Sequence, residues 1–194
     1  MIEPDQAHFE SVPWCLEIIN DPDFVITPTF SRQPKPATED SLTATTLKTK
    51  DTIQACLSVY RRPPPGATWI NEVRSLMTLG TGMNGAPFML HGGIVATLMD
   101  DCVGTLMTVN EAATEDRESV PLSSMAVTAY MNIQYKSPVT TPQTVLVIAK
   151  SREVKGRKFY LDSEIRDEYG HVLATAESLW ISVVPHQKRL KERL

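Results

Sequence analysis

The sequence predicts an α+β protein in which one long helix packs against an antiparallel sheet. Residues 94–108 place apolar side chains over more than half of a helical wheel, which is typical of a helix that a sheet surrounds. Residues 125–135 alternate apolar and polar side chains with a period of two, and three more segments of strand composition follow. This order of elements indicates one helix on one sheet.

The first 40 residues are expected to form an arm outside the main domain. The stretch "SVPWCLEIIN" predicts a short helix, with Ser11 as its N-cap and Pro13 in its first turn. Residues 21–40 contain four prolines, which favour an extended and irregular course.

The main domain is expected over residues 41–185. Residues 41–62 are rich in Thr, Val and Leu and predict one or two strands, and residues 68–80 predict another. A loop, "TGMNGAP", leads to the long helix, expected at about residues 92–109. The polar stretch "NEAATEDRES" then predicts a surface loop.

The last third predicts an antiparallel meander. After residues 125–135, turns at Gly156 and at "EYGH" separate further strands, expected at residues 144–154, 158–167 and 172–184. Residues 186–194, "HQKRLKERL", form a basic tail.

Bulk properties exclude several classes of protein. A chain of 194 residues suffices for one domain with a sizeable core, and its formal net charge of −4 gives no reason to expect nucleic acid or an anionic membrane as a partner. No Cys/His cluster suggests a metal site, and three widely spaced cysteines favour a reducing compartment. Without a signal peptide or an apolar run of membrane-spanning length, we expect a cytoplasmic protein.

Two glycines at the expected start of the long helix invite a functional interpretation. The first turn of a helix leaves backbone N–H groups without partners at its positive end. Because Gly92 and Gly93 carry no side chains, an anion or a polarised carbonyl can approach these groups, as in an oxyanion hole. A tight, closely packed turn is the alternative, and His91 before the helix can be purely structural.

Two aspartates interrupt the apolar helix. Asp100 falls at the edge of the apolar arc, between the small residues Ala96 and Gly104, which leave a gap for a ligand or another chain. A buried carboxylate without a partner is costly, so a functional role or a structural hydrogen bond is expected there. Asp101 falls on the polar arc, where a solvated or structural role is expected.

The distance between these features predicts a shared site. Gly93 and Asp100 are seven residues apart, about 10 Å along a helix. Donors to a carbonyl oxygen must lie about 3 Å from it, and the attacking group must lie close to the carbonyl carbon. Two antiparallel copies of the helix can meet both conditions, so a site at a homodimer interface is expected, twice per dimer.

Two stretches of the sequence resemble the PaaI-type acyl-CoA thioesterases of the hotdog superfamily. The stretch "HGGIVATLMDD" is similar to the signature of that family, and "VTAYMNIQYKSPV" is similar to its following strand, including an Asn-x-x-Tyr-x-x-Pro ending. The resemblance covers roughly residues 70–183, and the arm resembles the extension of fungal members. It implies a hotdog fold, a curved antiparallel sheet wrapped around one long central helix, which dimerises and sometimes forms a dimer of dimers.

The resemblance also implies roles for single residues. The catalytic acid of the family, nine residues after the motif histidine, falls on Asp100, and its oxyanion glycine falls on Gly92. The strand Ser/Thr that assists the acid falls on Thr128, on the polar face of its alternating strand, and His91 takes the place of the positioning histidine.

Further positions are expected to contact substrate. The family's loop asparagine is best matched by Asn84, with Gly85 one residue nearer the HGG, and Gly93 completes the glycine pair. Strand and loop cations would face the nucleotide end of coenzyme A, with Lys136 and Arg157 as the chosen candidates beside Lys150, Arg152 and Lys158. For most of these cations, a solvated basic face is the alternative.

The implied reaction is hydrolysis of an acyl-CoA thioester without a metal or redox cofactor. Asp100 would attack the carbonyl directly or activate water. Two alternatives share the same motifs: an enzyme acting on acyl or polyketide groups held by a carrier protein, and a non-catalytic acyl-binding protein.

Overall fold

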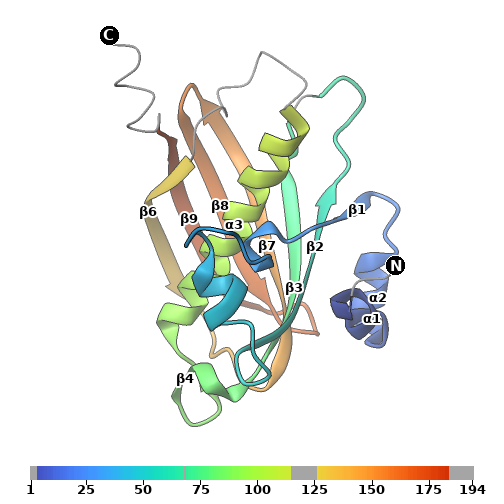
Figure 1. Cartoon of the computed structure of the whole chain (residues 1–194), viewed down its shortest axis with the longest axis vertical. Coiled ribbons are helices and arrows are strands. Elements are labelled where there is room, and N and C mark those ends of the chain that lie inside the picture. The colour runs from blue at the N-terminus through green and yellow to red at the C-terminus, as the bar shows by residue number, and fades with distance from the viewer. Residues whose placement is uncertain (1–3, 68, 115–125, 184–194) are drawn as a thin grey trace.

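A seven-stranded antiparallel sheet curves around the long helix α3 (Gly92–Thr114) in the computed structural model, which describes residues 4–67, 69–114 and 126–183 (Figure 1). The strand order is β1-β2-β3-β7-β8-β9-β6. The α+β class and the single central helix are confirmed. The strands are β1 (Phe24–Thr27), β2 (Ile53–Arg61), β3 (Glu72–Leu79), β6 (Ala126–Tyr135), β7 (Gln143–Lys155), β8 (Lys158–Arg166) and β9 (Val172–Ser182).

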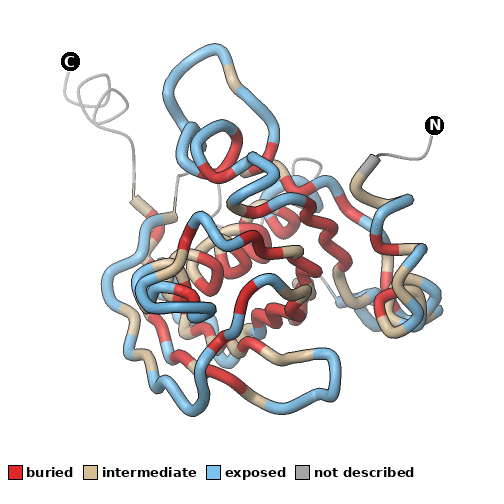
Figure 2. Tube along the Cα trace, turned by 90° about the horizontal axis from the view of Figure 1, so that it is seen from below, coloured by how far each residue is buried: buried red, intermediate tan, exposed pale blue. Residues whose placement is uncertain are grey.

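The core lies between α3 and the concave face of the sheet, where buried residues gather in Figure 2. Fully buried helix residues include Leu98, Met99, Cys102, Val103 and Leu106. By length and hydropathy alone, residues Gly92–Ala113 would also suit a membrane span, contrary to our reading of the sequence. In the structure, these side chains are buried against the sheet, so the apolar composition of α3 is that of a core helix.

Helix α3 runs five residues further than expected, into the predicted surface loop. Asn110 is fully buried, and its amide donates to the carbonyls of Ile70 and Leu106 and accepts from the Ile70 N–H. These bonds tie the last turns of the helix to the segment before β3. The loop prediction for this part was therefore wrong, because a polar residue was satisfied by a distant backbone rather than by water.

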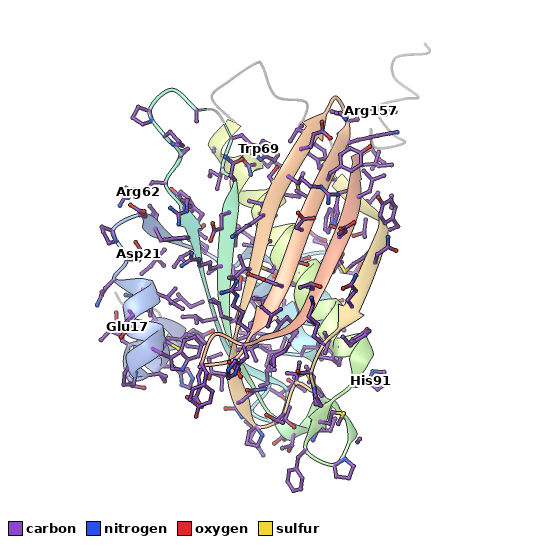
Figure 3. All side chains as sticks on the ribbon, turned by 180° about the vertical axis from the view of Figure 1, so that it is seen from behind. Glu17, Asp21, Arg62, Trp69, His91 and Arg157 are labelled. Carbon is purple, nitrogen blue, oxygen red and sulfur yellow. The ribbon has the colours of Figure 1, made fainter. Side chains whose placement is uncertain are left out.

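The beginning of the arm packs on the outer face of the sheet as two short helices, α1 (Pro4–Glu10) and α2 (Pro13–Ile19) (Figures 1 and 3). Phe9 and Cys15 are completely buried in a second apolar cluster with residues of β2, β3 and β7. The helix with Pro13 in its first turn is confirmed, but its N-cap is Val12 rather than Ser11. The Ser11 hydroxyl instead donates to the His8 carbonyl, 2.6 Å away, at the end of α1.

The rest of the arm crosses to the other side of the molecule and lies over α3 (Figure 1). β1 joins the sheet beside β2, and a 3₁₀ turn, η1 (Phe30–Arg32), follows. Residues Leu42–Thr46 form a π-helical turn, η2, where a strand was expected. The buried Arg32 guanidinium donates to the carbonyls of Thr43, Leu47 and Ile53, so it holds this turn and the start of β2 together.

The predicted loop before α3 contains a small hairpin. A 3₁₀ turn, η3 (Thr81–Met83), precedes β4 (Asn84–Ala86) and β5 (Met89–Leu90), which pair with each other. The His91 N–H donates to the Met83 carbonyl, and this bond closes the hairpin directly before the helix.

Strand β6 stands at the end of the sheet and has a β-bulge between Thr128 and Tyr130. Before the bulge, Thr128 reaches α3 through Asp100; after it, Met131 and Ile133 pack against the core. The helix-facing positions therefore change from even to odd numbers along one strand. The prediction that Thr128 lies on the polar face was wrong, because the extra residue of the bulge reverses the alternation.

Candidate active site

The first turn of α3 holds one backbone donor that is still available. The imidazole Nδ1 of His91 accepts the Gly93 N–H at 2.9 Å, and the His91 carbonyl accepts from Ile94 and Val95. The Gly92 N–H has no acceptor among the residues that the structure describes. The helix therefore presents a single N–H at its positive end, on the residue that the motif assigned to the oxyanion hole.

Close packing around the imidazole explains the other two glycines. A Cβ on Gly85 would lie 3.0 Å from the His91 ring carbon Cδ2, and a Cβ on Gly93 would lie 3.1 Å from Nδ1. Both positions thus leave room for the ring that caps the helix. In the structure, the His91 ring therefore caps the start of α3, and Gly85 and Gly93 pack against this ring.

Tyr135, which our sequence analysis did not choose, borders the free N–H. Its hydroxyl donates to the Gly92 carbonyl at 3.0 Å, and its ring lies 3.6 Å from the position of a Cβ on Gly92. The Asn-x-x-Tyr-x-x-Pro ending contained this signal. A pocket of about 330 Å³ opens here, lined by Met89, Leu90, Gly92, Val95, Tyr135 and Lys136, among others.

Asp100 is held from the opposite direction, by strand β6. The Thr128 hydroxyl donates to the Asp100 carboxylate at 2.7 Å, as the family resemblance implied. Burial raises the pKa of the Asp100 carboxyl above its ordinary value, and the hydrogen bond from Thr128 opposes that rise. The pair therefore offers a positioned carboxylate of increased basicity, which suits a general base.

Asp101 has a different environment, beneath the arm. Burial raises its pKa to about 6, and the Ser31 hydroxyl and the charge of Arg32 oppose that rise. Of the roles left open for this residue, a structural one fits these contacts.

Asn84 lies on β4, close in sequence to the helix start. Its side-chain oxygen accepts a hydrogen bond from the buried Thr141 hydroxyl at 2.6 Å. The side-chain amide nitrogen has no acceptor within the described part of the chain, so it remains available as a donor.

The two candidate cations lie far apart in the chain. Lys136 lines the pocket at Gly92. Arg157 lies in the turn between β7 and β8, at the opposite end of the molecule from His91 (Figure 3). Within one protomer, the structure brings Lys136 to the helix start and leaves Arg157 away from it.

Gly92 and Asp100 are also separated within one chain. They are eight residues apart on one helix, which corresponds to about 12 Å of rise. A second hollow of about 450 Å³ lies beside Asp100, distinct from the pocket at Gly92. One thioester carbonyl cannot contact both groups of the same protomer.

The thiols are unsuited to nucleophilic attack. Cys56 and Cys102 are buried, and burial raises the pKa of each thiol to about 12. Both stay protonated near neutral pH, so the carboxylate of Asp100 is the better candidate for the reacting group.

Comparison with known proteins agrees with the motifs. The family model described as "Thioesterase superfamily" matches residues 89–174, which include the start of α3 and Asp100. Verlamelin biosynthesis protein B of a Lecanicillium species is 29% identical over 168 residues, 74% of this chain and 72% of that protein. Acyl-coenzyme A thioesterase THEM4 of Mus musculus is 30% identical over 114 residues, 58% of this chain but only 44% of the mouse protein.

Among solved structures, a mutant hypothetical thioesterase protein from Streptococcus pneumoniae TIGR4 superposes with a TM-score of 0.50. The match covers 61% of this chain and 88% of that one, at 13% sequence identity. At this identity the similarity concerns the fold, the sheet curved around one helix.

Proposed function

We propose that this chain, whose residues 89–174 match the thioesterase superfamily model and whose sheet curves around one helix as in the hotdog fold, hydrolyses acyl-CoA thioesters to a free acid and coenzyme A. One observation carries the proposal. The same helix presents a free backbone N–H at Gly92 and, two turns later, a carboxylate bonded to Thr128 at Asp100. These are the two groups that acyl transfer needs: a donor for the developing oxyanion and a base or nucleophile.

We propose that each site combines Gly92 of one protomer with Asp100 of a second copy. The separation of the two groups within one chain supports this, and so does the exposed edge strand β6. Along β6, Val127, Tyr130 and Tyr135 are 37%, 45% and 58% exposed, although a long apolar edge is usually covered. Pairing of two β6 edges across a two-fold axis would continue the sheet and bring the helices together in antiparallel orientation.

In the proposed reaction, the carbonyl oxygen of the thioester accepts a hydrogen bond from the Gly92 N–H. The positive end of the helix stabilises the negative charge that grows on this oxygen. Asp100 removes a proton from water, whose oxygen adds to the carbonyl carbon. The tetrahedral intermediate then collapses with cleavage of the carbon–sulfur bond, and the proton passes to the leaving thiolate. Direct attack by the carboxylate uses the same two groups and passes through an anhydride that water hydrolyses.

Release of free thiol from a panel of purified acyl-CoA thioesters tests the activity. Wild-type turnover that Asp100→Asn abolishes is the expected result. Absence of turnover with every acyl-CoA, together with hydrolysis of the same acyl groups on a carrier protein, would contradict coenzyme A as the thiol. Absence with both carriers would favour a binding protein.

A mixture of two inactive variants tests the shared site. Asp100→Asn and Gly92→Val are co-expressed, so that about half of the dimers contain one copy of each. In a mixed dimer, one site has both defects and the other has neither, so activity should recover to roughly a quarter of wild type. If each site lies within one chain, every site in the mixture keeps one defect and no activity returns.

We also propose a cytoplasmic location, which the three buried, free cysteines favour. Fractionation of cells that express this chain tests the location. Detection of the protein in membrane or organelle fractions alone would contradict it.

A further inference from the structure

The hollow beside Asp100 lies between the arm, helix α3 and the end of the sheet. Its volume is about 450 Å³, within the usual range for small-ligand pockets. Phe30 and Ser31 of η1 form one wall, and the helix forms another through Gly104 and Met107. The hollow therefore adjoins the carboxylate that we assign to catalysis, and it is bounded by a segment of the arm.

Gly104 makes room in this hollow on the helix side. A Cβ built on Gly104 would lie 3.5 Å from the Cη2 atom of Trp180, in ordinary contact, so a larger side chain here would fill space next to the indole. Trp180 is 8% exposed, and Met107 is buried. With Phe30 and Ala126, these residues give the hollow a substantial apolar lining.

The charges around the hollow select against anions. Among the described residues, the carboxyl groups of Asp40, Asp100 and Asp101 line it, together with one ammonium group, that of Lys35, which is paired with Asp40. The pocket at Gly92 has the opposite character, since Lys136 is the charged residue among the described residues that line it. The phosphates of coenzyme A would be repelled by the first hollow and favoured by the second.

The arm wall is firmly attached to the core. Arg32, next to Phe30 and Ser31, is 4% exposed and donates three hydrogen bonds to backbone carbonyls of residues 43, 47 and 53. Since a buried guanidinium with these bonds is costly to withdraw, the wall has a defined position relative to α3.

We propose, on the basis of the proposed function, that an uncharged acyl chain occupies this hollow and that the arm, through Phe30, limits its length. The coenzyme A portion then leaves across the pocket at Gly92 of the other protomer, past Lys136. Acyl groups whose far end is a carboxylate are excluded by the carboxyl groups of the lining.

Two substitutions with opposite effects on the hollow test this assignment. kcat/KM is measured for straight-chain acyl-CoA thioesters of increasing length with wild type, Gly104→Val and Phe30→Ala. Gly104→Val should lower kcat/KM for the longest good substrate about 10-fold or more and leave the shortest within about 2-fold. Phe30→Ala should move the optimum to longer chains. Tyr169→Ala is the matched control. Tyr169 is 76% exposed in the turn before β9, so this substitution removes an aromatic ring that does not line the hollow.

An acyl-CoA with a carboxylate at the far end of its acyl chain tests the exclusion of anions from the hollow. Wild type should hydrolyse an ω-carboxyacyl-CoA at least about 10-fold less efficiently than the uncharged thioester of equal length. Equal efficiency would overturn the exclusion of acidic acyl groups.

Binding measurements separate this inference from the activity itself. S-alkyl coenzyme A thioethers cannot be hydrolysed, so calorimetric titration gives their chain-length preference even if the protein turns over no thioester. An unchanged preference in both Gly104→Val and Phe30→Ala would overturn the acyl site while leaving hydrolysis intact. If Gly104→Val unfolds, as thermal melting would reveal, Gly104→Ala and Phe30→Ala carry the test.

Discussion

On the side of α3 that faces β6, Asp100 accepts a hydrogen bond from Thr128 and borders an open hollow. On the side covered by the arm, Asp101 lies beside Ser31 and Arg32. Burial raises the pKa of both carboxyls. The direction of the pKa shift therefore does not distinguish Asp100 from Asp101, but their neighbours do. Asp100 accepts its hydrogen bond from strand β6, whereas Asp101, which lines the same hollow, has Ser31 and Arg32 of the arm as its neighbours. From this difference in neighbours we propose that Asp100 serves chemistry and Asp101 serves structure.

The largest expected effect separates the two carboxyls directly. Asp100→Asn keeps the size of the side chain but removes the base, so kcat should fall at least about 100-fold with the oligomeric state unchanged. Asp101→Asn should stay within about 3-fold of wild type. Thiol-release kinetics with sedimentation of both variants provide the measurement, and similar losses in the two would remove the distinction.

The next effect concerns the hydrogen bond that only Asp100 receives from β6. Thr128→Val removes the donor that opposes the rise of the Asp100 pKa, so this pKa should increase further. The active form is ionised, so activity is lost as pH falls through the pKa, and the acidic limb of the kcat/KM profile should move to higher pH. We expect a loss of about 10-fold at the lower end of the profile.

Thr128→Ser keeps the hydroxyl and should restore the wild-type limb. If Thr128→Val lowers kcat equally at every pH, the hydroxyl acts on geometry alone and not on the protonation of Asp100.

The arm side predicts an effect on stability. Since the folded-state pKa of Asp101, about 6, lies above its ordinary value, the folded protein binds this proton more tightly than the unfolded chain does. Its contribution is most favourable below about pH 4, decreases as pH rises toward 6 and is constant above that. A rise of this size corresponds to about 3 kcal/mol.

Asp101→Asn should therefore be more stable than wild type above pH 6, by up to about 3 kcal/mol, with the difference shrinking toward pH 4. Urea unfolding at several pH values measures this. A variant that is less stable at pH 8 would show that the ionised carboxylate supports the arm through Arg32.

The smallest effect concerns the helix start. Tyr135→Phe removes one exposed hydrogen bond to the Gly92 carbonyl, worth about 1 kcal/mol, so we expect a fall in kcat of a few-fold. A positioning role predicts little change in KM for short acyl groups. A loss as large as that of Asp100→Asn would instead place the phenol in direct contact with the reacting atoms.

Local pattern alone was sufficient for much of the fold. The start of α3 at Gly92 and the strands β3, β7, β8 and β9 follow from helix-start signals and from apolar runs between turns, which depend on neighbours in sequence. The choice of Asp100 and Gly92 required the motif, since a helical wheel equally allows a structural carboxyl and a tight turn.

Tertiary contacts decided the remaining features. The bulge in β6 turned Thr128 toward Asp100, and Asn110 extended α3 through bonds to Ile70, because partners distant in sequence satisfied these polar groups. The arm followed the same rule. The carbonyls of Thr43 in the π-helical turn and of Leu47 directly after it accept hydrogen bonds from the Arg32 guanidinium, which hold this part of the arm in place. Periodicity in the sequence determined which residues face a core, but it contains no information about which distant backbone groups a buried polar side chain will meet.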